Sequence, residues 1–231
     1  MKLPYLFGWA ALLLSASTLF GDDSLHLTFE GETAKDASQG RPVELENVVV
    51  MQAGSKAYAD LDGKGALVIP SDPGLVFGPN DTFWLTALIN PQAKGKSYPI
   101  VSKGGNYRIA LQPDGKPLFT YYSKGAWRSI VSEVPLELNA WQQIAVYFDS
   151  SRGATTLFID GKVAAIAQAQ EPFQSVGEDP LYIGGAPVPE TGEFRGFFGY
   201  IGSVTLDRSA PQEFPATLEL GTKAFEVAPA F

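Results

Sequence analysis

Aromatic side chains outside the regular apolar pattern are the residues of this sequence best suited to binding a ligand. Tyr121 and Tyr122 are neighbours in a run that alternates like a strand, so one of the two rings faces outward. Trp127 and Arg128 follow a turn a few residues later. A flat aromatic face stacks on a sugar ring, and a guanidinium bonds the hydroxyls. These four residues are therefore a candidate carbohydrate site, with cross-strand aromatic packing as the alternative interpretation.

Residues for catalysis are scarce. The sequence has no cysteine, which excludes disulfides, thiolate zinc sites and cysteine nucleophiles, and it has a single histidine, His26. A glycosidase needs two carboxylates that flank one bond in a cleft. The nearest pairs lie at a strand start, across a proline and in a Pro/Gly loop: Glu44 with Glu46, Glu133 with Glu137, and Glu190 with Glu193. None has the pattern of a cleft strand, so we expect no enzymatic activity and keep a glycan hydrolase as the alternative.

Charge and composition describe an acidic globular protein. Its 17 basic and 25 acidic residues give a net charge of −8, which disfavours nucleic acid as a partner. About 45% of the residues are hydrophobic, enough for a sizeable core without disulfides.

Short alternating runs separated by turn residues predict an all-β chain. Pro113-Asp114-Gly115-Lys116 and Asp160-Gly161-Lys162 each join two such runs and predict hairpins. About a dozen strands at this spacing predict a two-sheet antiparallel jelly-roll sandwich in one domain, residues 22–208. The expected strands are 24–30, 45–51, 66–70, 83–90, 106–112, 117–122, 126–132, 141–148, 155–159, 163–167, 181–183 and 197–206.

The N-terminus has the pattern of a secretory signal peptide. Lys2 precedes an apolar run, residues 3–16, and small residues then offer a cleavage site near Gly21. The run is shorter than a spanning helix requires, and no later segment is long enough to cross a bilayer. We therefore expect cleavage of residues 1–21 and a secreted or periplasmic protein. Residues 209–231 are expected to form an edge strand or a tail.

The order of short motifs is typical of one family. The motifs are Leu27–Glu30 with Ala34–Gly40, Phe83–Pro91, Ile100–Gly105, Leu138–Val146, Leu157–Lys162, Leu181–Gly185 and Phe198–Val204. Together they resemble the bacterial laminin-G-like domains of the concanavalin A-like lectin/glucanase superfamily, across residues 24–208. The sequence departs from that family at Gly202, where many relatives carry Asp or Glu.

The resemblance implies a possible calcium site. First and last strands pair in this family, which would bring together Glu30, Asp36 and Asp207, whose carboxylates suit Ca²⁺. Gly202 removes an acid from this region and weakens that expectation. The alternative is that these are solvated turn residues, with Asp36 in an Asx turn.

The resemblance also implies a function and leaves alternatives open. Trp141, which precedes the alternating Ile144, Val146 and Phe148, is interpreted as a core anchor, with a sugar-stacking platform as the alternative. The expected function is an exported, non-catalytic recognition module for carbohydrate or for an extracellular or envelope protein. A purely structural domain is the remaining alternative, because a fold does not determine a function.

Overall fold

The computed structural model describes residues 24–149, 153–168, 172–175, 178–188, 191–208 and 226–227. Their secondary structure consists of β-strands and one short 3₁₀ helix, Pro73–Leu75 (η1). The predicted signal peptide and most of the predicted tail lie outside the described residues. Within the described part of the chain, no helix is long and apolar enough to cross a membrane.

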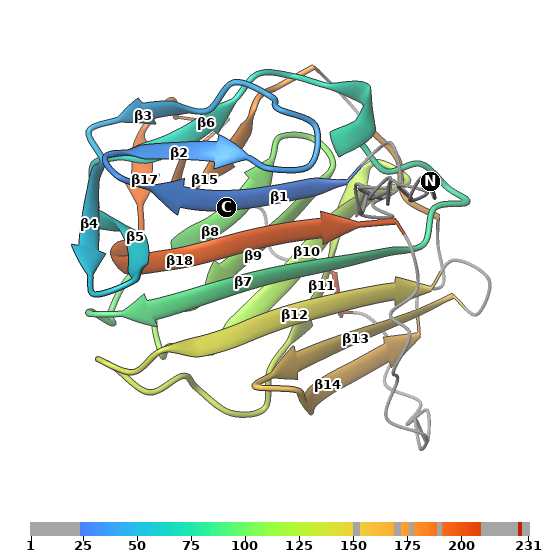
Figure 1. Cartoon of the computed structure of the whole chain (residues 1–231). Coiled ribbons are helices and arrows are strands. Elements are labelled where there is room, and N and C mark those ends of the chain that lie inside the picture. The colour runs from blue at the N-terminus through green and yellow to red at the C-terminus, as the bar shows by residue number, and fades with distance from the viewer. Residues whose placement is uncertain are drawn as a thin grey trace, which may run out of the picture.

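Nine strands form sheet A, the front layer in Figure 1. They are Leu25–Glu30 (β1), Thr33–Asp36 (β2), Val49–Ala53 (β4), Lys56–Asp62 (β5), Phe83–Pro91 (β7), Gln142–Asp149 (β12), Ala154–Ile159 (β13), Lys162–Gln168 (β14) and Phe198–Asp207 (β18). The hydrogen-bonded order is β14, β13, β12, β7, β18, β1 and β2, while β5 pairs with β18 and with β4. β18 thus has β7 on one side and shares its other side between β5 and β1.

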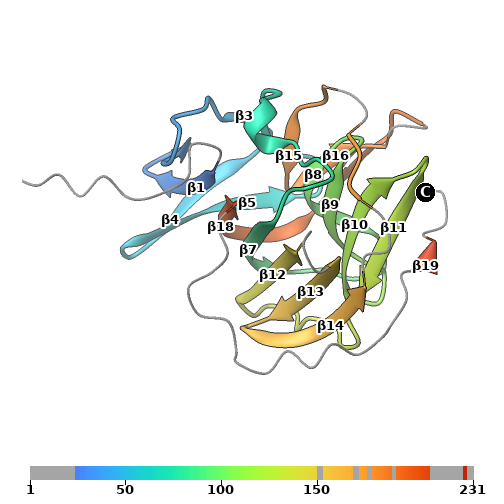
Figure 2. The ribbon, with the colours of Figure 1, turned by 90° about the vertical axis from the view of Figure 1, so that its right-hand side faces the viewer.

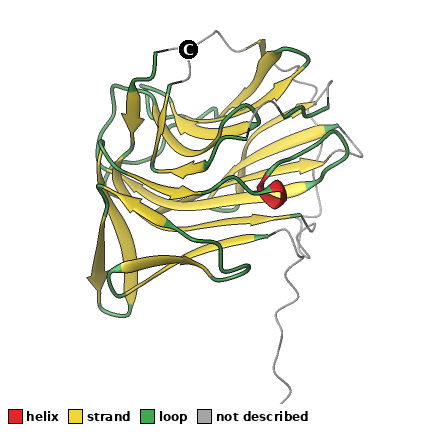
Figure 3. Ribbon diagram, turned by 90° about the horizontal axis from the view of Figure 1, so that it is seen from above, coloured by secondary structure: helices red, strands yellow, loops and turns green. Residues whose placement is uncertain are grey.

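Eight strands form sheet B, which lies behind sheet A as the second layer of a sandwich (Figures 2 and 3). They are Glu44–Glu46 (β3), Ala66–Ile69 (β6), Tyr98–Lys103 (β8), Tyr107–Leu111 (β9), Pro117–Ser123 (β10), Ala126–Val131 (β11), Leu181–Ile183 (β15) and Glu226–Val227 (β19). Their order is β19, β11, β10, β9, β8, β15, β6 and β3. A separate two-stranded sheet joins Gly185–Pro187 (β16) to Phe194–Gly196 (β17).

The predicted fold class is confirmed: the strand pairs of both sheets are antiparallel, as in a concanavalin A-like jelly roll. The two predicted hairpins form as β9–β10 and β13–β14. In the second, Asp160 and Gly161 both have positive φ, 48° and 72°, which a two-residue hairpin turn requires.

The core lies between the sheets and is rich in aromatic rings. Alternate residues of β7 and β12 point inward, as period-2 patterning requires, and Phe83 stacks on Phe77 with ring centroids 3.8 Å apart. Phe173, outside the regular strands, is fully buried and stacks on Tyr121 at 4.4 Å. The inward side chains of β7 and β12 are Phe83, Leu85, Ala87, Ile89, Ile144, Val146 and Phe148.

Candidate functional site

Two of the four residues of the predicted carbohydrate site lie together on the outer face of sheet B. Tyr122 and Trp127 are paired in register across β10 and β11, with ring centroids 5.6 Å apart in an edge-to-face arrangement. Tyr121 is fully buried, so its ring belongs to the core and has no face free for a ligand. Arg128 pairs with Tyr121 in the same ladder and therefore lies on the opposite face of β11 from Trp127.

The cation beside Trp127 is Arg108 instead. Its guanidinium carbon lies 5.6 Å from the centroid of the Trp127 ring, and its Nε donates to Ser102 Oγ at 3.3 Å. Tyr122, Trp127 and Arg108 are all half-buried, so they cover one another's surfaces. This arrangement is the cross-strand packing that the sequence left as an alternative.

The predicted calcium ligands do not converge. Leu25 pairs with Leu206, so Asp207 lies beside the start of β1, whereas Glu30 is the last residue of that strand. The length of β1 separates them by roughly 20 Å at ~3.3 Å per residue. Glu30 forms an exposed ion pair with Lys35. The described residues contain no group of three or more histidine or acidic side chains able to hold a metal ion.

Asp36 has a structural role. Its buried carboxylate accepts hydrogen bonds from Ser38 Oγ at 2.6 Å, from the backbone N–H groups of His26 and Ser38, and from Arg41 Nη1 at 2.9 Å. Burial alone would raise the pKa of the Asp36 carboxyl, but these donors outweigh it and hold the pKa below its usual value. The guanidinium already compensates the charge that calcium would compensate.

The acidic pairs considered for hydrolysis are exposed or undescribed. Glu44 and Glu46 lie on β3 at the edge of sheet B, and Glu133 and Glu137 are also exposed to solvent. Glu190 lies outside the described residues. Glu193, its partner in the sequence, lines a pocket described next.

A cavity of about 610 Å³, here called the end pocket, opens where strands of both sheets end. Its walls come from the turn after β5, the segment between β7 and β8, the strand β17 and the start of β18. Two of these walls touch where the backbones of Gly63 and Gly196 meet. Only glycine permits this close approach, because a β-carbon on Gly196 would lie 2.4 Å from the Gly63 carbonyl. The lining residues are Asp62, Gly63, Lys64, Ala93, Lys96, Ser97, Tyr98, Glu193, Phe194, Arg195, Gly196 and Phe198.

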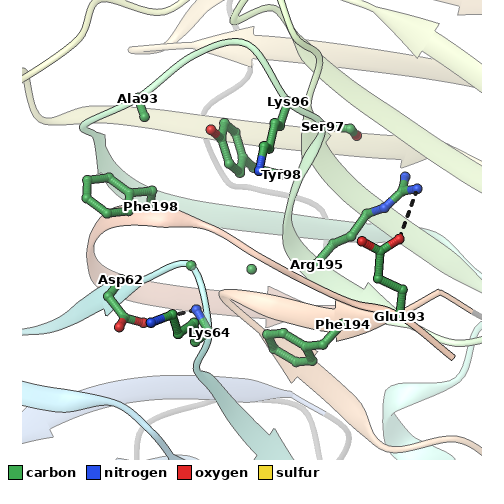
Figure 4. Close-up of a pocket in the computed structure, with 12 residues that line it drawn as sticks. Asp62, Lys64, Ala93, Lys96, Ser97, Tyr98, Glu193, Phe194, Arg195 and Phe198 are labelled. Carbon is green, nitrogen blue, oxygen red and sulfur yellow. Dashed lines mark hydrogen bonds and ion pairs between the residues drawn. The ribbon is translucent and has the colours of Figure 1, made fainter.

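The end pocket combines exposed rings with charged groups (Figure 4). Phe194 and Phe198 retain 37% and 44% of their accessible surface, an unusual exposure for phenylalanine. Lys64 lies on the wall opposite Lys96, and among the described residues neither ammonium group has an ion-pair partner within 4 Å.

The other charged groups of the end pocket already have partners within the protein. Arg195 Nη2 lies 3.9 Å from Glu193 Oε2, and Asp62 Oδ1 accepts a hydrogen bond from the backbone N–H of Lys64. Donors and acceptors thus surround two apolar ring faces.

Sequence reasoning did not find this pocket. The signal was present in Phe194-Arg195-Gly196-Phe197-Phe198, where three phenylalanines, an arginine and a glycine lie together at the start of β18. The other walls lie roughly 100 to 130 residues earlier, at Asp62–Lys64 and Ala93–Tyr98. The pairing of β18 with β5 brings the first of these walls close, and its pairing with β7 brings the second.

A second cavity of similar volume lies beside η1, between residues 76–79 and 172–175. Its rings, Phe77 and Phe173, are fully buried and belong to the core. It offers fewer side-chain donors than the end pocket and is a weaker candidate for binding.

Searches for similar structures find toxin binding domains and a domain of a carbohydrate-active enzyme. The binding domain of Paraclostridial Mosquitocidal Protein 1 is 15% identical with a TM-score of 0.67, and the match covers 81% of this chain and 49% of that one. The binding domain of botulinum neurotoxin serotype D/C gives 15% identity and a TM-score of 0.64, over 83% and 50%. This chain thus spans about half the length of those domains.

Domain 4 of AbnA, a GH43 extracellular arabinanase from Geobacillus stearothermophilus, was solved in complex with arabinotriose. It is 16% identical with a TM-score of 0.60, and the match covers 80% of this chain and 91% of that domain. At such identities the likeness establishes the fold. No curated protein matches the sequence.

A family model gives the assignment at the level of sequence. The model described as the concanavalin A-like lectin/glucanases superfamily matches residues 61–211, more than half of the chain. The matched segment includes most of the jelly roll and all lining residues of the end pocket, from Asp62 to Phe198. The chain belongs to the concanavalin A-like lectin/glucanase superfamily.

Proposed function

We propose that this protein is an exported, non-catalytic carbohydrate-binding module and that the sugar occupies the end pocket. The observation that carries the proposal is the pair of exposed rings, Phe194 and Phe198, surrounded by charged side chains in one cavity. A sugar ring has apolar C–H faces and a rim of hydroxyls, so it needs this combination of flat rings and polar groups.

The polar groups suit a hydroxylated ligand. Lys64, Lys96 and Arg195 donate hydrogen bonds, and Asp62 and Glu193 accept them. A hydroxyl does both, so each of these groups has a partner on a sugar. With three cations against two carboxylates, the pocket is close to neutral and favours neither a strongly anionic nor a cationic ligand.

Proteins of the same fold support the choice of ligand class. The arabinanase domain was solved with arabinotriose, and one neurotoxin binding domain was solved with SialylT. Another botulinum neurotoxin depends for cell entry on two ganglioside molecules. A further binding domain was solved with the protein synaptotagmin II, so a protein partner is the outcome to consider if no carbohydrate binds.

The same pocket is poorly equipped for hydrolysis. A glycosidase keeps one carboxyl group in apolar surroundings so that it stays protonated and can act as the acid. The side chain of Glu193 is 67% exposed and lies beside Arg195, and Asp62 is also exposed. These carboxylates suit hydrogen bonding to hydroxyls, so we expect binding without cleavage.

The secretory pattern of residues 1–21 supports a location outside the cytoplasm, either secreted or periplasmic. Such a location would expose the module to polysaccharides of cell walls, capsules or surroundings.

A glycan and polysaccharide panel tests the proposal. Wild-type protein is expected to bind one class of neutral or weakly charged polysaccharide saturably, and Phe198→Ala is expected to lose at least about tenfold in affinity. Trp127→Ala removes an aromatic ring outside the pocket and serves as the matched control, with unchanged affinity. Folded wild-type protein that binds nothing on the panel would contradict the proposal, and release of reducing ends would show an enzyme.

A further inference from the structure

Three aromatic side chains gather on the outer face of sheet A, next to the end pocket. The ring centroid of Tyr58 lies 5.6 Å from that of Trp141 and 5.1 Å from that of Tyr200, and those of Trp141 and Tyr200 are 6.2 Å apart. We call these residues the aromatic cluster. Trp141 was expected to anchor the core, but it keeps 43% of its accessible surface.

The expectation for Trp141 was wrong because the residue precedes β12 and lies on its outer side. Gln142 pairs with the buried Ile89, and the inward positions that follow are Ile144 and Val146. Trp141 therefore has the parity of the outward positions. Its ring packs over Gly202, with Tyr58 edge-on at an interplanar angle of 70°.

The aromatic cluster is continuous with the end pocket. Phe198 lines the pocket, and Tyr200 follows two residues later in β18, so both side chains leave the same face of the strand roughly 7 Å apart. Asp62 and Asp60 of β5 pair in register with Phe198 and Tyr200. A carboxylate acceptor therefore lies on the neighbouring strand opposite each ring.

We infer that the end pocket and the aromatic cluster form one extended surface for a polysaccharide chain, with successive sugar units from Phe198 past Tyr200 to Trp141. This inference rests on the proposed function. A single terminal sugar would be held by the pocket alone and would leave the indole of Trp141 unused. A chain also uses the outer cluster, where flat rings alternate with hydrogen-bond acceptors.

The rigidity of the aromatic cluster supports binding of a chain. Tyr58, Tyr200 and Gly202 contact Trp141 and fix the orientation of its ring before any ligand arrives. A side chain that is already ordered loses little conformational entropy on binding. Each added sugar unit that reaches the cluster can then increase the affinity.

The test is the dependence of affinity on chain length. Wild-type protein, Trp141→Ala and Phe198→Ala are titrated with arabinan-, xylan- and cellulose-derived oligosaccharides, from disaccharides to hexasaccharides. For the series that binds, the affinity of wild-type protein is expected to rise with length. Trp141→Ala should match wild-type protein on disaccharides and lose about tenfold on hexasaccharides. Phe198→Ala should lose affinity at every length.

Controls separate the inference from the proposed function. Trp141→Phe keeps a ring and should recover part of the hexasaccharide affinity, and thermal unfolding of each variant verifies its fold. Equal affinity of Trp141→Ala and wild-type protein at every length, together with a loss in Phe198→Ala, would overturn the inference and leave the proposed function standing. Failure of wild-type protein to bind any series would overturn both.

Discussion

Gly202 controls the position of the Trp141 ring on the surface. β18 bulges between Ile201 and Ser203, and Gly202 lies at this bulge under the ring of Trp141. A β-carbon here would lie 3.2 Å from Cζ3 of Trp141 and 3.1 Å from Cδ2 of Leu88. The absence of a side chain at Gly202 therefore leaves room for the ring of Trp141.

Gly202→Val tests this steric role. The added side chain should displace the indole of Trp141 and lower the affinity for hexasaccharides by about tenfold, with disaccharide binding unchanged. Ser203→Ala, at the neighbouring position of the same strand, is the control. A titration in which Gly202→Val binds hexasaccharides as wild-type protein does would contradict this role.

Asp36 gives a prediction about pH. Its folded-state pKa lies below the usual value of a carboxyl group, so its contribution to stability is present above about pH 4 and is lost as the pH falls through the folded-state pKa. Asp36→Asn removes the shorter of the two ion pairs of the buried Arg41, which keeps only the partly exposed Asp72 at 3.3 Å, and should lower the free energy of unfolding by about 3 kcal/mol at pH 7.

Urea denaturation of wild-type protein and Asp36→Asn between about pH 3 and pH 7 measures this difference. The difference in the free energy of unfolding between the two proteins should narrow as the pH falls below about 4, because Asp36 of the unfolded wild-type chain then takes up a proton, while the folded carboxyl, with its lowered pKa, is still ionised. A gap that stays constant across the range would show that the charge of Asp36 does not matter.

Residue-level predictions from the sequence succeeded where they depended on local geometry. Alternation required that Tyr121 and Tyr122 face opposite sides, and the structure shows this. Which of the two rings faces outward depends on how β10 packs against the other sheet. The alternation of residues along β10 alone does not determine this. The cation over Trp127 comes from Arg108, on a strand two places away in sheet B, so its identification needed the sheet order.

At the scale of elements, the loop segment 172–175 packs against one end of the core and covers it. Phe173 packs against Tyr121 and Phe148, with ring centroids at 4.4 and 4.5 Å. The backbone is fixed as well, because the Gln174 N–H donates to the Tyr122 carbonyl and Ser123 Oγ donates to the Pro172 carbonyl. This segment completes the core without belonging to either sheet.

Phe173→Ala is expected to destabilise the protein by about 3–5 kcal/mol, because it leaves a cavity among aromatic rings. Chemical denaturation gives the value, with Gln174→Ala as the control since the side chain of Gln174 is exposed. A decrease in the free energy of unfolding below about 1 kcal/mol would show that segment 172–175 contributes little to stability. Carbohydrate affinity of the folded variant should not change.

Elements with strong local signals were predictable from the sequence. The hairpins β9–β10 and β13–β14 follow from Pro-Asp-Gly and Asp-Gly turn chemistry. β5 was not predicted, because its inward residues include the small Ala59, which gives a weak apolar signal, and its outward residues include Asp60 and Asp62, which have low strand propensity. The strands β16 and β17 have three residues each and are too short for any period to show.

At the scale of the whole molecule, the end pocket is a product of topology. Its walls come from segments far apart in the sequence, and the two sheets bring their ends together at one end of the sandwich. The fold class and approximate strand positions could therefore be predicted from periodicity and turns, whereas the site could not. The positions of the predicted calcium ligands also depend on topology, because the direction of pairing places Glu30 and Asp207 at opposite ends of β1.

The stability of the whole domain should not depend on calcium, since Arg41 and backbone donors already satisfy Asp36. The melting temperature with excess EDTA is expected to stay within about 1 °C of its value with millimolar calcium. Differential scanning calorimetry measures it. A clear drop on chelation that calcium reverses would show a metal site and contradict the structural assignment of Asp36.

The most direct test of the binding site is chemical-shift mapping by NMR of the protein titrated with the oligosaccharide that binds. The amide signals of residues 62–64, 96–98 and 194–200 are expected to shift together and to saturate with one affinity, while the signals around Arg108, Tyr122 and Trp127 do not shift. Saturable shifts centred on Trp127, with the end pocket unperturbed, would contradict it.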